Sequence, residues 1–82
     1  MKIYPNPFEH FLNIEYDISS QTNVRLTIFN SIGEPVRQLV NQVQEPDHYT
    51  IQWDSHLQSS GIYIIKLEVG AKQTIQKVTL LR

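Results

Sequence analysis

Three histidines are the residues of this sequence whose chemistry most readily suggests a metal site. His10, His48 and His56 follow none of the spacings, such as His-x-Glu or His-x-x-x-His, that are typical of metal ligands. In a strand, residues on one face lie two positions apart, and no two of the histidines are related in this way. Because a metal site needs several convergent ligands, we expect exposed or loop histidines with no bound metal.

Three aspartates offer a second possible site. Asp17, Asp47 and Asp54 lie near the ends of expected strands, and carboxylate oxygens are the ligands that calcium prefers. Aspartate is also an ordinary turn residue. We therefore favour the turn interpretation and predict neither a metal nor any other cofactor.

No combination of residues points to catalysis. The sequence contains no cysteine, which excludes zinc sites built on thiolates and thiol nucleophiles. It has neither a Ser-His-Asp order nor a glycine-rich phosphate loop. We predict that the protein is not an enzyme.

The length and charge of the chain narrow its class. Its 82 residues, 40% of them hydrophobic, suffice for one domain with a single thin core between two layers. Seven Lys and Arg against eight Asp and Glu give a net charge of −1, so we expect no nucleic-acid partner, which would require a basic face. Neither a signal peptide nor a transmembrane segment of about 20 apolar residues is visible. We expect any export signal to lie on a longer parent chain.

Alternation of apolar and polar residues predicts most of the strands. Residues 12–18, 24–28 and 49–53 alternate with period two, which is typical of half-buried antiparallel strands. Residues 62–69 are apolar at nearly every position as far as Leu67, which indicates a central strand covered on much of both faces. In residues 73–81, Ile75 and Val78 have opposite parity, which predicts a bulge or twist.

Turn residues separate these segments. Gly33, in the loop at 30–35, can supply a positive φ, and Gly70-Ala71 suits a two-residue hairpin with glycine first. The polar stretch 54–60 is expected to carry the chain from one sheet to the other. No window has helical periodicity. About seven short strands at roughly ten-residue spacing predict an all-β, immunoglobulin-like antiparallel β-sandwich, without the disulfide of antibody domains.

Some aromatic and aliphatic residues have two possible roles. Trp53 could be a platform for stacking sugars, but it keeps phase with Tyr49 and Ile51, which favours a place in the core or at its edge. Phe29, Ile62 and Ile64 have the parity of outward positions. A loop could cover them, or they could form a patch for a partner.

Several segments, taken in order, resemble a known family. They are Tyr4-Pro5-Asn6-Pro7-Phe8, the strand at 24–30 followed by Gly33, Ile51-Gln52-Trp53-Asp54, Ser60-Gly61-Ile62-Tyr63 and Lys77-Val78. In this order and spacing the whole chain resembles the type A C-terminal sorting domain of the type IX (Por) secretion system. It is more distantly similar to the flagellar-hook-cap immunoglobulin-like domain, which shares the Trp-Asp and Gly-x-Tyr features.

The resemblance implies that the domain is a sorting signal for protein export. In this family the folded domain is recognised by an outer-membrane translocon, and a sortase-like enzyme often cuts just before it. The cargo passes through the periplasm and is then released or attached to the cell surface of a Gram-negative bacterium. Residues 1–82 are thus expected to be a single sorting domain, part of a longer secreted protein, with its oligomeric state left open.

The resemblance also implies which residues the translocon recognises, and physical arguments suggest a structural role for most of them. The residues are Pro5, Asn6, Pro7, Gly33, Gly61, Tyr63 and Lys77. Two prolines remove N–H donors and suit an edge strand. Gly61 suits a close backbone approach, and the ring of Tyr63 is expected to point inward with its hydroxyl reaching a loop. Lys77 either discourages pairing at a sheet edge or contacts the receptor.

One position departs from the family pattern. Where the family usually has glycine, two residues before the strand that contains Trp53 begins, this chain has Asp47. Aspartate tolerates left-handed backbone better than most residues, so we expect the turn to be kept at some cost in strain.

Two other functions fit the same fold. A non-catalytic accessory module of an extracellular enzyme, binding carbohydrate or acting as a spacer, predicts a planar strip of exposed aromatic residues. An adhesion or assembly domain predicts an open sheet edge.

Overall fold

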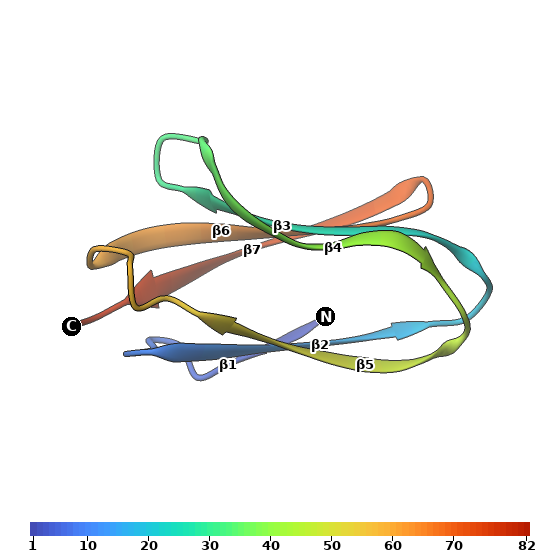
Figure 1. Ribbon diagram of the computed structural model, residues 1–82, viewed down its shortest axis with the longest axis horizontal. Coiled ribbons are helices and arrows are strands. Elements are labelled where there is room, and N and C mark those ends of the chain that lie inside the picture. Colours follow the sequence, from blue (N-terminus) through green and yellow to red (C-terminus); the bar gives the residue numbers. More distant parts are fainter.

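The strands form two packed sheets. A computed structural model describes residues 1–82 and contains seven strands and no helix. The strands are β1 (Lys2–Tyr4), β2 (Phe11–Ile18), β3 (Thr22–Asn30), β4 (Pro35–Gln44), β5 (Asp47–Asp54), β6 (Gly61–Val69) and β7 (Lys72–Leu80). One sheet has the order β1-β2-β5 and the other the order β4-β3-β6-β7, with antiparallel pairing throughout (Figure 1). The predicted seven-stranded antiparallel sandwich is confirmed.

The core lies between the two sheets and follows the predicted alternation. In β2 the side chains of Leu12, Ile14, Tyr16 and Ile18 are at most 4% exposed, while the residues between them point outward. Together with partners from the other strands they form a cluster of sixteen buried hydrophobic residues. β6 lies between β3 and β7, which confirms its central position. Its expected coverage on both faces is wrong, because Ile62 is 46% exposed and Ile64 is half-buried on the outer face.

The predicted bulge in the last strand is wrong. β6 and β7 pair without interruption from Gly61 opposite Leu80 to Val69 opposite Lys72. Alternation is kept because Ile75 points outward, where it is 55% exposed. The irregularities lie instead between β3 and β4, where the register shifts twice. These shifts break the alternation of β4, which explains why no strand could be expected at 35–44 from the pattern alone.

The predicted turns have mixed outcomes. Gly70-Ala71 forms the expected two-residue hairpin, with φ +59° at Gly70. A Cβ there would lie 2.9 Å from Thr22 Oγ1, so the site also lacks room for a side chain. The segment after Asp54 carries the chain from the three-stranded sheet to the four-stranded sheet, as predicted. The expected strain at Asp47 is wrong. No residue other than glycine has a positive φ. Asp47 has extended backbone because it already pairs with Ile18 in the ladder.

Candidate recognition surface

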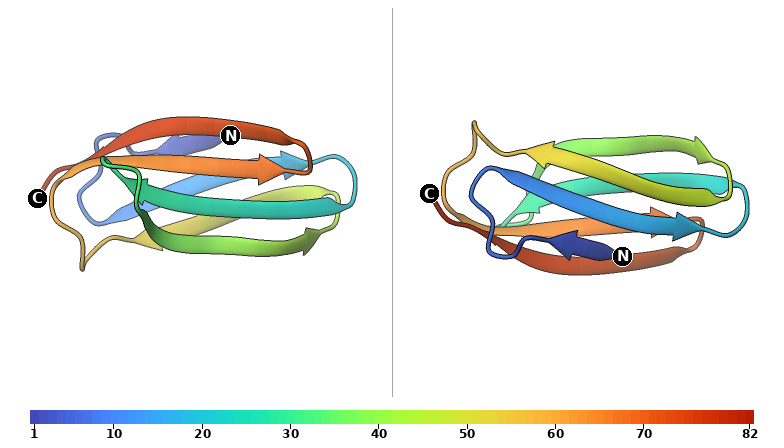
Figure 2. Two further views of the ribbon diagram at one scale, coloured as in Figure 1. Left: turned by 90° about the horizontal axis from the view of Figure 1, so that it is seen from above. Right: turned by 90° about the horizontal axis from the view of Figure 1, so that it is seen from below.

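The N-terminal segment connects the two sheets along the edge of β7. β1 pairs with β2 in the three-stranded sheet, and the chain then passes to the other sheet at Phe8. The Phe8 amide donates a hydrogen bond to the Thr79 carbonyl (2.9 Å), and the Leu81 amide donates to the Phe8 carbonyl (2.9 Å). In Figure 2, β1 lies on the same side of the sandwich as β7, in the opposite layer. This edge of the four-stranded sheet is therefore partly covered.

Asn6 extends the same contact with its side chain. Its Oδ1 accepts a hydrogen bond from the Thr79 amide (3.1 Å), and its Nδ2 donates a longer one to the Lys77 carbonyl (3.5 Å). The amide group thus takes the place of a neighbouring strand, while Pro5 and Pro7 add no N–H donors of their own. Two of the positions implied by the resemblance, Asn6 and Lys77, are brought together through the backbone of β7.

Replacing Asn6 with aspartate tests this arrangement. The carboxylate can still accept from the Thr79 amide, but its second oxygen would face the Lys77 carbonyl instead of donating to it. We expect a loss of about 0.5–1.5 kcal/mol in the free energy of unfolding, the usual contribution of one hydrogen bond. Denaturant titration measures it, and Asn23→Asp, at an exposed position of β3, is the control. Equal stability of both variants would contradict the proposed pairing.

Gly61 and Tyr63 begin the central strand beside the end of β7. Gly61 has φ +154°, and a Cβ there would meet no atom within 4 Å. The expected close approach at Gly61 is therefore wrong, and the requirement for glycine is one of backbone conformation. Tyr63 is 5% exposed and its hydroxyl donates to the Ser59 carbonyl (2.7 Å). Both the inward ring and the contact with a loop are as predicted.

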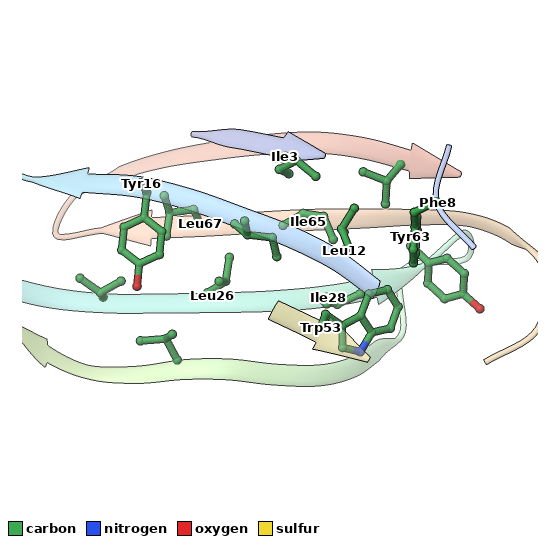
Figure 3. Packing of buried hydrophobic residues seen from close by; sticks show 14 of the residues in the cluster. Ile3, Phe8, Leu12, Tyr16, Leu26, Ile28, Trp53, Tyr63, Ile65 and Leu67 are labelled. Atoms are coloured by element: carbon green, nitrogen blue, oxygen red, sulfur yellow. The ribbon is translucent and has the colours of Figure 1, made fainter. Parts of the chain in front are cut away.

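Three aromatic rings join the separate motifs inside the core. Trp53 packs against Phe8, with ring centroids 5.7 Å apart, and against Tyr63, at 5.4 Å and 65° (Figure 3). Trp53 is 4% exposed, which confirms its place in the core and contradicts a sugar-stacking platform. The cluster brings together the N-terminal motif, the Trp-Asp strand and the Gly-x-Tyr strand, although they are far apart in the sequence.

Gly33 serves a local turn between β3 and β4. It has φ +87°, and its amide donates to the Asn30 carbonyl (3.0 Å). The Asn30 side chain accepts hydrogen bonds from the amides of Ile32 (3.2 Å) and Glu34 (2.9 Å). The turn lies at the same end of the sandwich as the 55–60 loop and the C-terminus (Figures 1 and 2). Its role is to fix the hairpin, which requires glycine at the positive φ.

Nearly the whole chain matches a known protein family. The family model described as "Secretion system C-terminal sorting domain" matches residues 2–80. The chain belongs to this family. It is thus a C-terminal sorting signal of the type IX secretion system. Neither a curated protein nor a solved structure matches the chain. The sorting domain has no helix that is long and apolar enough to cross a membrane.

Arg82 holds the 55–60 loop of the sorting domain, and nothing in the sequence pattern indicates this. Its guanidinium donates hydrogen bonds to the carbonyls of Ser55, His56 (3.0 Å) and Gln58 (2.6 Å). Ser55 in turn donates from its hydroxyl to the His10 carbonyl (2.7 Å). Only the fold brings position 82 to a loop more than twenty residues earlier, where five guanidinium N–H donors can satisfy several carbonyls at once.

The aspartates and histidines of the sorting domain form pairs on the outer face of the three-stranded sheet and at its end. The histidine side chains are 52–57% exposed, as predicted. His48 lies in β5 between Asp17 (2.8 Å) and Glu15 (3.1 Å), while His10 and His56 both contact Asp54. No group of three or more side chains could hold a metal. The calcium alternative is contradicted, because Asp54 lies at the opposite end of β5 from Asp47.

The His48 cluster is expected to make the stability of the domain depend on pH. The hydrogen bond to Asp17, together with the negative charges of Asp17 and Glu15, holds the pKa of His48 above its usual 6.5. Protonated His48 therefore stabilises the fold below about pH 6.5, and this contribution is lost as the pH rises through the folded-state pKa. At the acid end, the Tyr4 hydroxyl and His48 hold the pKa of Glu15 below 4.5. That contribution is present above this pH and is lost on acidification.

We expect the urea midpoint of the wild-type domain to fall as the pH is raised from about 6 to about 9. His48→Gln and Asp17→Asn should each reduce this fall, because each removes one side of the main pair. The measurement is urea denaturation followed by tryptophan fluorescence at a series of pH values. If His48→Gln kept the full wild-type pH dependence, the assignment to this cluster would be wrong.

Proposed function

We propose that the folded sandwich is the signal that the outer-membrane translocon of the type IX system recognises. It would act on a cargo that has reached the periplasm of a Gram-negative bacterium, as one domain of a longer secreted protein. In this proposal the domain is a ligand and a substrate, and it catalyses nothing itself. The cargo is delivered to the cell surface or to the medium.

The contact of Phe8, Trp53 and Tyr63 is the observation that carries this proposal. The family motifs lie in three separate segments, and their side chains meet only when both sheets are formed. The Asn6 contact with β7 likewise requires the folded chain. A receptor that depends on these positions would therefore depend on the fold that they hold together.

A sortase-like enzyme is the second proposed partner. Cleavage is expected before β1, because β1 is paired with β2 and Phe8 is tied to Thr79 and Leu81 by backbone hydrogen bonds. Proteases need an extended and accessible backbone, which loops and linkers provide more readily than paired strands. We therefore place the processing site N-terminal to Lys2, outside the sandwich.

A reporter fusion tests the proposed function. Residues 1–82 are fused to the C-terminus of a periplasmic reporter in a host with a working type IX system, and the reporter is measured in the medium, on the cell surface and in the periplasm. Export is expected in this host, and retention in an otherwise identical host that lacks the translocon. Retention of the wild-type fusion in both hosts would contradict the proposal.

The accessory-module alternative lacks its main support. It requires a planar strip of exposed aromatic residues, and the single tryptophan is buried between Phe8 and Tyr63. The adhesion alternative requires an open edge. The edge of β7 is partly closed by Asn6 and Phe8, so this alternative would have to use β1, β4 or β5, the other edge strands.

A further inference from the structure

Six side chains of the four-stranded sheet point away from the core and lie next to one another. We call them the outer patch: Phe29, Ile62, Ile64, Ile75, Lys66 and Lys77. In the ladder, Phe29 is opposite Ile64, and Ile64 is opposite Lys77. In the adjacent outward row, Lys66 is opposite Ile75. Such cross-strand neighbours have Cβ atoms about 4.5–5.5 Å apart, so the patch is continuous across β3, β6 and β7, on the face seen in the left view of Figure 2.

The apolar part of the patch is open to solvent. Ile62 is 46% exposed and Ile75 is 55% exposed, while Phe29 and Ile64 are half-buried. Coverage by a loop, one of the two alternatives left open for Phe29, Ile62 and Ile64, is therefore wrong, and a patch for a partner stays a hypothesis. The outward positions of the other sheet are mostly polar, with Asn13 opposite Gln52 and Glu15 opposite Thr50. Tyr4 and Phe11 are exposed on the three-stranded sheet as well. On the four-stranded sheet, however, the apolar side chains are direct neighbours, and a contiguous apolar patch is typical of an interaction site.

The lysines of the patch have no partner within the domain. Neither Lys66 nor Lys77 makes a salt bridge, and the only pair on this face is Arg25 with Glu68, at 3.9 Å. On the opposite face, Asp17, Glu15 and Asp54 are already paired with histidines. The long stems of the lysines can lie along apolar surface while their ammonium groups remain free for a partner. The two free ammonium groups on this face would therefore pair well with acidic side chains of a binding partner.

We propose that the outer patch is the docking face for a component of the secretion machinery whose surface is apolar at its centre and acidic at its rim. This inference rests on the proposed function. A second copy of the domain fits the patch poorly, because a symmetric dimer would place the same face against itself and bring lysines together. Strand addition at the edge of β7 is also opposed, since Asn6 and Phe8 occupy it.

The test compares matched substitutions inside and outside the patch in the reporter fusion. The patch variant is Ile75→Thr with Lys77→Glu. The control is Val43→Thr with Lys72→Glu, since Val43 is also 55% exposed on a strand and Lys72 is also an exposed lysine of β7. Thermal unfolding of each purified domain establishes that both variants are folded. Losing a central contact together with a complementary charge is expected to reduce export about tenfold, while the control should export like wild type.

Each outcome of the test bears on the proposal. A folded patch variant that is exported at the wild-type level would overturn the docking face and leave the sorting function intact, since the wild-type fusion is exported in the same experiment. Retention of the wild-type fusion would instead mean that the sorting function itself fails. Sedimentation of the wild-type domain gives an independent measurement. A stable dimer that Ile75→Thr dissociates would overturn the proposal in favour of a second copy as the occupant.

Discussion

Replacing Trp53 with alanine is expected to unfold most of the domain and to abolish export. The indole is 4% exposed and packs against the rings of Phe8 and Tyr63. Removing a buried aromatic side chain costs about 3–5 kcal/mol, because it leaves a cavity that the surrounding core fills only in part. The total stability of a single domain is about 5–15 kcal/mol, and a chain of this size has a small core.

The effect on stability and the effect on export can be measured separately. In a domain of about 60–100 residues, each kcal/mol shifts the melting temperature by about 4–8 °C, so calorimetry should record a fall of tens of degrees. Phe11→Ala, on the neighbouring strand and 45% exposed, is the control and should change little. If Trp53→Ala proved unfolded in the purified domain and still directed export, the signal would be a linear sequence and not the folded sandwich.

Replacing Gln44 with leucine is expected to destabilise the opposite end of the core. Gln44 is 5% exposed and Tyr16 is 3% exposed, and the Tyr16 hydroxyl donates to Gln44 Oε1 (2.8 Å). Leucine is apolar and cannot accept this hydrogen bond, so the hydroxyl is left buried without a partner. Such a group costs about 1–3 kcal/mol in the free energy of unfolding. The loss should appear as a lower urea midpoint with an unchanged slope.

A double-mutant cycle distinguishes the hydrogen bond from simple repacking. Tyr16→Phe alone leaves the Gln44 carbonyl oxygen unpaired and should cost a similar amount. The double variant Tyr16→Phe/Gln44→Leu replaces both partners by apolar groups and is expected to recover most of the lost stability. Additive losses in the double variant would show that the two side chains contribute independently.

Polar contacts, as well as the core, hold the two ends of the domain in place. Asn6 binds the backbone of β7, and Arg82 binds three carbonyls of the 55–60 loop. Both contacts lie at the end of the sandwich where the aromatic cluster also lies. The positions that the family resemblance implies for recognition therefore belong mainly to one structural region, and many of them have a demonstrable role in holding it together.

Local pattern was sufficient for much of the fold. The alternation of Leu12, Ile14 and Tyr16 located β2, because a strand exposes successive side chains to opposite faces. Gly70 located a hairpin, because its positive φ is available to glycine without steric cost. The phase of Trp53 with Ile51 placed it in the core. The family could also be inferred from short segments, since their order and spacing are written in the sequence itself.

The remaining features depended on contacts between distant segments, which a single sequence does not encode locally. Three residues of β1 are too few to show a pattern, and two register shifts hide the alternation of β4. Asn6 meets β7, Arg82 meets Ser55 and His48 meets Asp17 only because the sheets pair and pack in this order. The outward lysines and isoleucines likewise become one patch through the register of β6 with β7. Periodicity assigns a side chain to a face of its own strand, whereas the tertiary structure decides which strands lie beside it.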